Sequence, residues 1–335
     1  MTATESPGKR PQHACVIVGH ATIDEIVFEH GEPAEVLGGA AVYAACGAAQ
    51  AGGQVSLVTL TGPDYDFAPL IRSVAEWTDG SLDVSSSRPG PAGTIRNRAW
   101  YGGPENRQWS VLDWDAMVAM SPGWQEAAPV VSAASSLVIC PTPVPIAADL
   151  LGHTPHGLDL VVVDTEVHYL STPELARQLI ERAGPGVILM PSWIHLPMLF
   201  SVSTQDTDDE ILRQVTRRCA DAGIDLLVIK RGVAGSVVID GRARSWTAIP
   251  AASCPVVVDP TGAGDVFDGA FAVTMARTGD PVEASCWGAA TASFAVEHRG
   301  ATIPPHFSRA EAAARLRDIR LGTRTPTASS ARRRS

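Results

Sequence analysis

The sequence has no long apolar run, no closely paired cysteines and no excess of positive charge. No uninterrupted apolar stretch approaches the roughly 18–20 residues of a membrane-spanning helix, and the first thirteen residues lack the apolar core of a secretory signal. We therefore expect a soluble, cytoplasmic protein without a membrane partner. The formal net charge of −10 argues against nucleic acid as a partner, because its phosphates would be repelled.

The six cysteines are scattered through 335 residues, and none forms a C-x-x-C pair. Structural zinc sites usually take their ligands from such close pairs, and a chain of this length can bury a core without disulfides. We therefore predict reduced, mostly buried cysteines. No G-x-G-x-x-G follows the first apolar run, and no Gly-Lys-Ser/Thr follows a glycine loop. These absences argue against a dinucleotide-dependent oxidoreductase and against a Walker A nucleotide site.

Short apolar runs alternate with helix-length segments along most of the chain. The runs are rich in Val, Ile and Leu, as in strands that are buried on both faces of a parallel sheet. The alternation predicts an α/β fold, with a doubly wound, mostly parallel central sheet and helices on both faces. The expected strands are Ala14–Gly19, Val55–Leu60, Ser136–Cys140, Leu160–Asp164, Gly186–Met190, Asp225–Lys230 and Ser236–Asp240. The expected helices are Gly39–Ala51, Thr172–Ala183, Asp208–Ala222, Ala263–Thr278 and Val282–His298.

Two segments in the N-terminal third, at about 25–37 and 93–113, break this alternation. Each has the pattern of a hairpin, with turns at Gly31 and at Gly102–Pro104. Each is too short to fold alone, so we expect the two to pair into a small β-sheet that covers the main domain as a lid.

The domain organisation follows from these patterns. We expect one domain over residues 14–320 that includes both lid segments. The residues outside it, 1–13 and 322–335, are polar or of low complexity and are expected to be disordered tails.

The clearest chemical signal lies in Val256–Ala272, VVVDPTGAGDVFDGAFA. An apolar run ends at Asp259, a glycine-rich turn follows, and an apolar helix begins near Ala263. Glycine lets the backbone approach a ligand closely. The unpaired amides and the positive dipole at a helix start attract anions. The segment therefore predicts an anion site.

Asp265 stands in the first turn of this predicted helix, next to the anion site. A carboxylate beside an anion site suits phosphoryl transfer. The amides of Gly262, Ala263 and Gly264 would stabilise the transferring phosphoryl group, and the Asp265 carboxylate would accept the proton of the attacking hydroxyl. The alternative is a plain strand-to-helix turn in which the aspartate only caps the helix.

The whole block D-P-T-G-A-G-D-V-F-D-G-A-F resembles the C-terminal signature of the ribokinase-like (PfkB) family of carbohydrate kinases. Other segments follow in family order from about Cys15 to Pro305. The resemblance implies a ribokinase-like fold and an ATP-dependent kinase that phosphorylates a hydroxyl of a small polyhydroxylated substrate, a sugar or a cyclitol such as inositol. It also implies ATP and Mg²⁺ as cofactors and raises the question of a monovalent cation near Asp259.

On the substrate side, the resemblance implies that Asp24, in VIVGHATIDEIVF, holds substrate hydroxyls, which suits a carboxylate. Gly38 and Gly39 would lie beside the substrate at a helix start. Tyr43 stands where many members have asparagine and is similar to the inositol-kinase branch and to some nucleoside-kinase branches. Arg96 is a further candidate, because arginine can clamp phosphates or hydroxyls. The plain alternatives are a surface carboxylate for Asp24 and a solvated hairpin residue for Arg96.

On the nucleotide side, LLVIKRGVAGSVV resembles the family's strand and turn along which ATP lies, and SFAVEHRGA resembles the end of the helix that flanks adenine. The implied cofactor-binding residues are Lys230, Gly232, Gly235, Thr261 and Ala289.

The chain departs from the family pattern after Met190. Many members have Asn-x-x-Glu there, which organises magnesium and phosphates, whereas this chain has Ser192 and His195. Histidine is a poor magnesium ligand. We therefore assign no residue as a metal ligand and interpret His195 as a packed residue or a neutral hydrogen-bond partner.

Two functional alternatives stay open at this point. One is a nucleoside kinase of the same family, and the other is a non-catalytic member that binds a small molecule without turnover. The expected partner is thus a small polyol, sugar or nucleoside. The lid hairpins would also expose edge strands, and a homodimer through the lid is one way to cover them.

Overall fold

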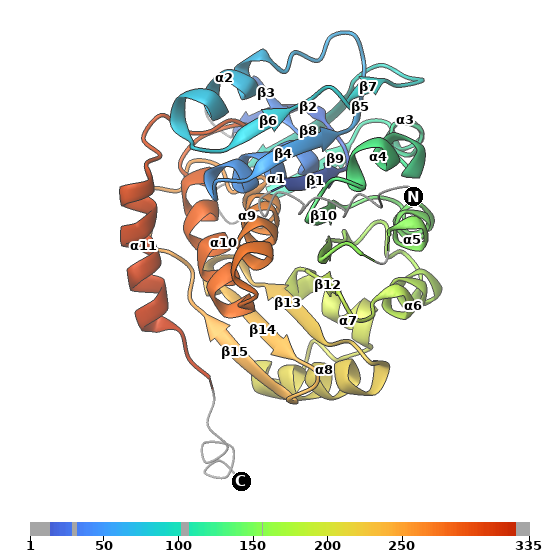
Figure 1. Ribbon diagram of the computed structural model, residues 1–335, viewed down its shortest axis with the longest axis vertical. Helices are drawn as coiled ribbons and strands as arrows, with labels where there is room; N and C mark the ends of the chain where they lie inside the picture. Colours follow the sequence, from blue (N-terminus) through green and yellow to red (C-terminus); the bar gives the residue numbers. More distant parts are fainter. Residues whose placement is uncertain (1–13, 29–31, 102–106, 156, 326–335) are drawn as a thin grey trace, which may run out of the picture.

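Nine strands form one large sheet in the computed structural model, which describes residues 14–28, 32–101, 107–155 and 157–325 (Figure 1). In order across the sheet these strands are β15 (Ser245–Ile249), β14 (Ser236–Asp240), β13 (Leu226–Lys230), β12 (Val187–Leu189), β11 (Leu160–Val163), β10 (Ser136–Ile139), β1 (Ala14–Val18), β4 (Gln54–Val58) and β6 (Ser81–Asp83). The strands from β13 to β6 pair in parallel, so the predicted mostly parallel sheet is confirmed.

One predicted strand has the other polarity. Ser236–Asp240 was predicted among the parallel strands, but β14 pairs antiparallel with β13 and with β15. The reason is the connection, because only residues 231–235 join β13 to β14. A parallel pair needs a crossover of about a dozen residues or more, whereas a short turn permits only an antiparallel pair.

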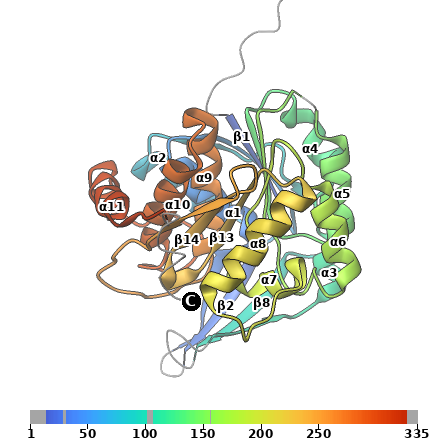
Figure 2. The ribbon, with the colours of Figure 1, turned by 90° about the horizontal axis from the view of Figure 1, so that it is seen from below.

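Helices cover both faces of the large sheet, as predicted (Figure 2). One face carries α1 (Ala40–Gln50), α2 (Ala68–Trp77), α9 (Ala263–Thr278), α10 (Pro281–Ala295) and α11 (Arg309–Gly322). The other carries α4 (Trp124–Val131), α5 (Val144–His153), α6 (Pro173–Arg182), α7 (Leu196–Phe200) and α8 (Asp208–Ala222). Successive β1 residues serve the two faces alternately, with Cys15 and Ile17 in the first core and Val16 and Val18 in the second.

A smaller sheet of four strands is built from the two predicted hairpin segments. Its order is β3 (Ala34–Gly38), β2 (Thr22–Phe28), β8 (Ile95–Tyr101) and β9 (Arg107–Val111). Strands β2 and β8 pair in parallel, so the predicted pairing of the two distant segments is confirmed. The predicted turns at Gly31 and Gly102–Pro104 lie outside the described residues. The remaining short elements are β5 (Leu60–Thr61), β7 (Arg88–Pro89), α3 (Trp114–Ala119) and the 3₁₀ turns Trp193–His195 and Gly232–Ala234.

Helices α1 and α9 touch backbone to backbone through two glycines. A Cβ on Gly47 would lie 1.9 Å from the carbonyl oxygen of Val266, and a Cβ on Gly269 would lie 1.9 Å from that of Ala44. No side chain larger than hydrogen fits at either position. The contact therefore fixes the two helices, and their N-terminal ends, relative to each other.

The end of the described chain returns to the large sheet. Helix α11 runs to Gly322, and Arg324 exchanges two backbone hydrogen bonds with Ala248 on β15, at 2.8 and 2.9 Å. The structured part thus extends beyond the boundary at residue 320 that the sequence analysis gave. Within the described residues, no helix is both long enough and apolar enough to cross a bilayer.

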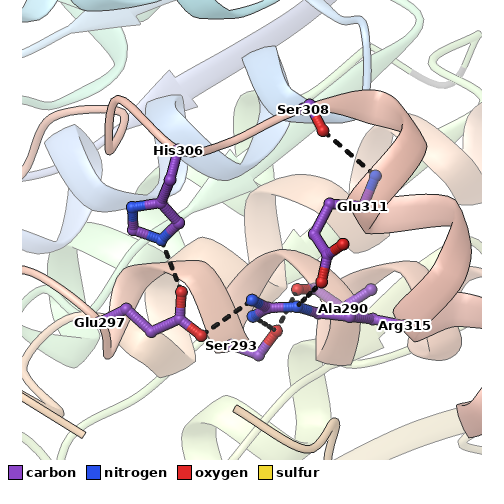
Figure 3. Close-up of polar contacts among 7 residues, drawn as sticks. All are labelled: Ala290, Ser293, Glu297, His306, Ser308, Glu311 and Arg315. Carbon is purple, nitrogen blue, oxygen red and sulfur yellow. Dashed lines mark hydrogen bonds and ion pairs between the residues drawn. The ribbon is translucent and has the colours of Figure 1, made fainter. Parts of the chain in front are cut away.

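A buried ion pair fastens α11 to the end of α10 (Figure 3). Arg315 Nη2 lies 2.9 Å from Glu297 Oε1, and the two side chains are 8% and 3% exposed. The Arg315 guanidinium also lies over the Phe294 ring, 3.8 Å from its centroid, and His306 Nε2 lies 2.5 Å from Glu297 Oε2. The adjacent Val296 carbonyl accepts hydrogen bonds from the amides of residues 258 and 259. The pair therefore anchors the backbone that leads into the Gly262 turn.

We expect Arg315→Met to lower the free energy of unfolding by about 3–5 kcal/mol, because it leaves the buried Glu297 carboxylate without its guanidinium. Urea-induced unfolding measures the change. Arg317→Met, on the exposed side of the same helix, is the matched control and should stay within about 0.5 kcal/mol of wild type. A loss as small as the control's would contradict the anchoring role of Arg315.

Candidate active site

A cavity of about 430 Å³ lies between the small sheet and the carboxyl ends of the parallel strands. The small sheet lines it with Thr22, Asp24, Asn97 and Val111. The large sheet contributes residues that follow β1, β10, β11 and β12, and Lys230 at the end of β13. Ligands of open α/β sheets bind outside the carboxyl ends of the strands. The volume also suits a small organic molecule, for which pockets of roughly 300–1,000 Å³ are usual.

Asp24 occupies the end of the cavity formed by the small sheet. Its side chain is fully buried, and its Oδ1 accepts hydrogen bonds from Thr22 Oγ1 at 2.7 Å and from Asn97 Nδ2 at 3.1 Å. A Cβ on Gly38 would lie 2.0 Å from Asp24 Oδ2. The predicted residue Gly38 therefore makes room for the carboxylate, while Gly39 lines the cavity itself.

Two helices begin at a glycine that lines the cavity. Helix α1 begins after Gly39, with φ 99°, and α9 begins after Gly262, with φ 75°, and neither N-cap makes a side-chain hydrogen bond. Several other helices begin at a capping side chain: Thr172, Thr207, Asp280 and Ser308. A glycine start leaves the first-turn amides accessible to a ligand. The Ala263 amide donates to Pro260 O over 3.4 Å, whereas Gly264 lines the cavity.

Asp265 lies in the first turn of α9 and lines the cavity. Tyr43, on α1, also lines the cavity and lies next to the Gly262 turn. A Cβ on Gly262 would lie 2.2 Å from the Tyr43 ring, so the ring supports the turn by direct contact. Burial and the negative charges of Asp24, Asp259 and Asp265 raise the pKa of the Tyr43 phenol well above its usual value. The phenol is therefore neutral. Its ring packs against the turn and also lines the cavity.

Lys230 lies in a buried cluster of carboxylates that the sequence analysis missed in part. Its Nζ donates to Asp164 Oδ2 and to Asp268 Oδ2, both at 2.6 Å. One oxygen each of Asp164, Asp265 and Asp268 lie within 4.8 Å of one another. The signal for Asp268 was its place three residues after Asp265, on the same helix face. Asp164 follows a different strand, and only the fold brings it to this cluster.

The carboxylates stabilise the Lys230 ammonium but disfavour one another's charged form. Burial alone would lower the pKa of the Lys230 ammonium, but Asp164, Asp268 and Asp265 raise it above its usual value. Burial and the nearby Asp164 raise the pKa of the Asp268 carboxyl, and Lys230 opposes that shift. Lys230 is the single lysine or arginine among the described residues that line the cavity.

Ser192 and His195, the residues that depart from the family pattern, both line the cavity. The Ser192 amide donates to His195 Nδ1 at 3.3 Å, so the neutral ring carries its proton on Nε2. Burial lowers the pKa of His195, despite the neighbouring Asp164 and Glu166. His195 therefore offers the cavity a hydrogen-bond donor.

Aromatic residues that the sequence analysis did not single out as site residues form one wall of the cavity. The centroid of the Trp114 ring lies 5.1 Å from that of the His168 ring and 6.0 Å from that of the Tyr169 ring, which meets Trp114 edge-on. The rings are tilted relative to one another, and each can offer an apolar face or edge to a ring-shaped ligand.

Several predicted site residues lie outside the cavity lining, among them Arg96, Gly232, Gly235 and Ala289. Arg96 points to the opposite face of the small sheet, where it pairs with Glu35 at 2.7 Å and with Asp64 at 3.0 Å. Its neighbour Asn97 faces the cavity instead. The turn of Gly232 and Gly235 is partly exposed, and Ala289, in the middle of α10, is buried in the core. Thr261 lines the cavity, and its amide donates to Asp259 Oδ1 at 2.9 Å.

His20 completes the lining next to β1. Its Nε2 lies 3.0 Å from the Met117 carbonyl oxygen and 2.8 Å from Ser121 Oγ. Burial lowers the pKa of this imidazole to about 4, although the Met117 and Pro141 carbonyl groups oppose the shift. His20 therefore links the cavity floor to α3 as a neutral side chain.

Comparisons with known proteins relate the chain to kinases. The sequence profile described as pfkB family carbohydrate kinase matches residues 198–307. Cytidine kinase of Thermococcus kodakarensis is 30% identical over 277 residues, which cover 80% of this chain and 90% of that enzyme. Among solved structures, Methanocaldococcus jannaschii nucleoside kinase has a TM-score of 0.67 at 20% identity, covering 93% of this chain and 100% of that chain. Arabidopsis thaliana ribokinase complexed with ribose and ATP has a TM-score of 0.70 at 21% identity, covering 91% and 98%. The two structural similarities establish the ribokinase-like fold.

The buried His20 predicts an acid-sensitive contribution to stability. As the pH falls below about 6.5, the unfolded state takes up a proton that the folded state refuses until about pH 4. Stability is therefore retained above the unfolded pKa and falls as the pH drops towards 4. Between pH 6.5 and 4, His20→Gln should lose about 3 kcal/mol less unfolding free energy than wild type. Denaturant unfolding at each pH measures both slopes, and equal slopes would contradict a neutral buried His20.

Proposed function

Since the chain belongs to the pfkB family of carbohydrate kinases, we propose that it transfers the terminal phosphoryl group of ATP to a hydroxyl of a small polyhydroxylated acceptor. One observation supports this proposal above the others. Asp265 lies in the first turn of α9, at a helix start with a glycine cap, and lines the same cavity as Asp24. A carboxylate base, an anion site and a hydroxyl-binding carboxylate thus share one cavity.

In the proposed complex, the acceptor lies against the small sheet. The Asp24 carboxylate accepts hydrogen bonds from acceptor hydroxyls, and Thr22 and Asn97 hold it in place through their bonds to Oδ1. Gly38 and Gly39 let the acceptor and the carboxylate approach the backbone. The small sheet then acts as a lid that keeps water from the reacting groups.

The proposed chemical step takes place at the start of α9. The Asp265 carboxylate accepts the proton of the attacking hydroxyl, whose oxygen forms a bond to the γ-phosphorus while the bond to the β–γ bridging oxygen breaks. ADP leaves with that oxygen. The amides of Gly262, Ala263 and Gly264 and the dipole of α9 stabilise the negative charge of the transferring group.

The nucleotide, which brings its own divalent cation as part of the substrate, is proposed to extend from this point over the exposed Gly232–Ala234 turn. Lys230 and Thr261 line its phosphate end. Gly235, with φ 84°, and the segment of α10 around Ala289 shape the outer part of this path. A monovalent cation near Asp259 and a homodimer through the small sheet stay predictions.

We expect Asp265→Asn to lower kcat by about 10²–10⁴, because the amide cannot accept the hydroxyl proton. Coupled measurement of ADP formation gives the rate, and circular dichroism and thermal unfolding confirm the fold. Asp318→Asn, on the exposed face of α11, is the matched control and should keep wild-type activity. Near-normal turnover by folded Asp265→Asn would contradict the proposed base. Failure of wild type to consume ATP with any acceptor would favour a binding protein without turnover.

A nucleoside is the second candidate acceptor. The aromatic wall of Trp114, His168 and Tyr169 can hold a base beside the ribose hydroxyls, and cytidine kinase of T. kodakarensis is 30% identical to this chain. A sugar or a cyclitol has no aromatic base to stack on this wall. Binding of a nucleoside should therefore depend on the aromatic wall, whereas binding of a sugar should not.

A panel of nucleosides, sugars and cyclitols tests the acceptor class. If nucleosides are phosphorylated, Trp114→Ala should raise their KM by about 5–100-fold, the worth of base stacking on an aromatic ring, and leave KM for any sugar acceptor unchanged. Trp100→Ala, on the outer face of the small sheet, is the control and should change neither. An equal rise in KM for sugars would contradict a base-binding role of Trp114.

A further inference from the structure

The acidic cluster below α9 has the composition of a metal site, but it already contains a cation. Oxygens of Asp164, Asp265 and Asp268 lie within 4.8 Å of one another, close enough to surround one ion. The Lys230 Nζ lies 2.6 Å from an oxygen of Asp164 and of Asp268. Mg²⁺ needs oxygens at about 2.0–2.1 Å in octahedral geometry. The ammonium occupies the Oδ2 atom of Asp164 and of Asp268, and its positive charge would repel a second cation placed among them, so the cluster as built does not fit a protein-held divalent ion.

We propose that the Lys230 ammonium is the resident cation of this site. It takes the place of a divalent metal among Asp164, Asp265 and Asp268, and it faces the phosphate groups of the nucleotide. The role towards the nucleotide phosphates rests on the proposed kinase function, whereas the replacement of a divalent metal by the ammonium does not. Divalent metal then enters only with the nucleotide and has no binding site in this cluster beforehand.

The position of the ammonium supports a role towards a bound anion. Lys230 is 7% exposed, yet it lines the cavity. A Cβ on Gly264 would lie 3.6 Å from Lys230 Nζ, so the ammonium is next to the first turn of α9. The Lys230 amide donates to Pro191 O at 2.9 Å and fixes the backbone. The side chain is thus held from both ends, as a fixed positive charge at the anion site requires.

The neighbouring His195 also acts as a donor and not as a metal ligand. Its Nδ1 accepts the Ser192 amide, which leaves the protonated Nε2 for the cavity. A nitrogen that carries a proton has no lone pair for a metal. Lys230 and His195 therefore both present hydrogen atoms to an anion, and neither presents a lone pair to a cation.

Mn²⁺ binding in the absence of nucleotide tests the inference directly. Electron paramagnetic resonance measures free Mn²⁺ in titrations of wild type, Lys230→Met and Lys230→Met/Asp268→Asn at pH 8. We expect wild type to bind weakly and Lys230→Met to bind at least about tenfold more tightly, because three carboxylates without a counter-ion attract a divalent cation. The Mn²⁺ affinity of the double variant should return towards that of wild type. Arg231→Met removes a neighbouring positive charge outside the cluster and should gain no site.

Lys230→Met leaves two buried carboxylates without their cationic partner and can fail to fold without metal. Thermal unfolding with and without Mn²⁺ covers this case, together with the milder Lys230→Gln, whose amide NH₂ group can still donate hydrogen bonds to the carboxylates. Mn²⁺ should raise the unfolding midpoint of both single variants and not that of wild type. Tight Mn²⁺ binding by wild type, or no gain by either single variant, would overturn the inference.

A kinetic experiment addresses the phosphate-facing role. Lys230→Gln should raise KM for ATP by at least about tenfold, the usual scale for a lost charge-assisted contact, and change KM for the acceptor much less. Equal changes in KM for ATP and in KM for the acceptor would show that Lys230 has a merely structural role. Since the Mn²⁺ experiment uses neither ATP nor acceptor, it can succeed even if the proposed kinase function is wrong.

Discussion

The contact between α1 and α9 is the constraint on which the site depends. Each helix starts at a glycine with positive φ, and both starts line one cavity. Their separation is fixed because Gly47 and Gly269 let the backbones touch. Any larger side chain at either position would push the helices apart. The distance between the acceptor end and the phosphate end of the cavity is therefore set in the core, about one turn after Asp265 on α9 and about two turns after the start of α1.

Much of the architecture could be predicted from the sequence because it is locally determined. Helices Asp208–Ala222 and Ala263–Thr278 have the predicted bounds, since their ends are marked by Thr207 and Gly223 and by Gly262 and Gly279. The polarity of β14 was missed because apolar runs look alike in parallel and antiparallel strands, and only the length of the connection separates them.

The candidate site was less predictable, because its contacts join distant segments. Asp164 follows β11, and its meeting with Lys230 and Asp268 has no local signal. Arg96 and Asn97 are neighbours on one strand, so one must face the cavity and the other solvent. The register that pairs Asn97 with Asp24 decides which, and the sequence does not contain that register in readable form. The aromatic wall likewise combines α3 with the loop after β11.

The return of the chain to β15 has a consequence for association. An open sheet ends in two strands whose free backbone groups can recruit a strand from another molecule. Here Arg324 already pairs with Ala248 at one border, and β6 at the opposite border has three residues, Ser81–Asp83. A strand from another molecule would have to displace Arg324 from β15 or pair with the three residues of β6. The molecule thus carries a wide sheet whose borders are poor templates for aggregation.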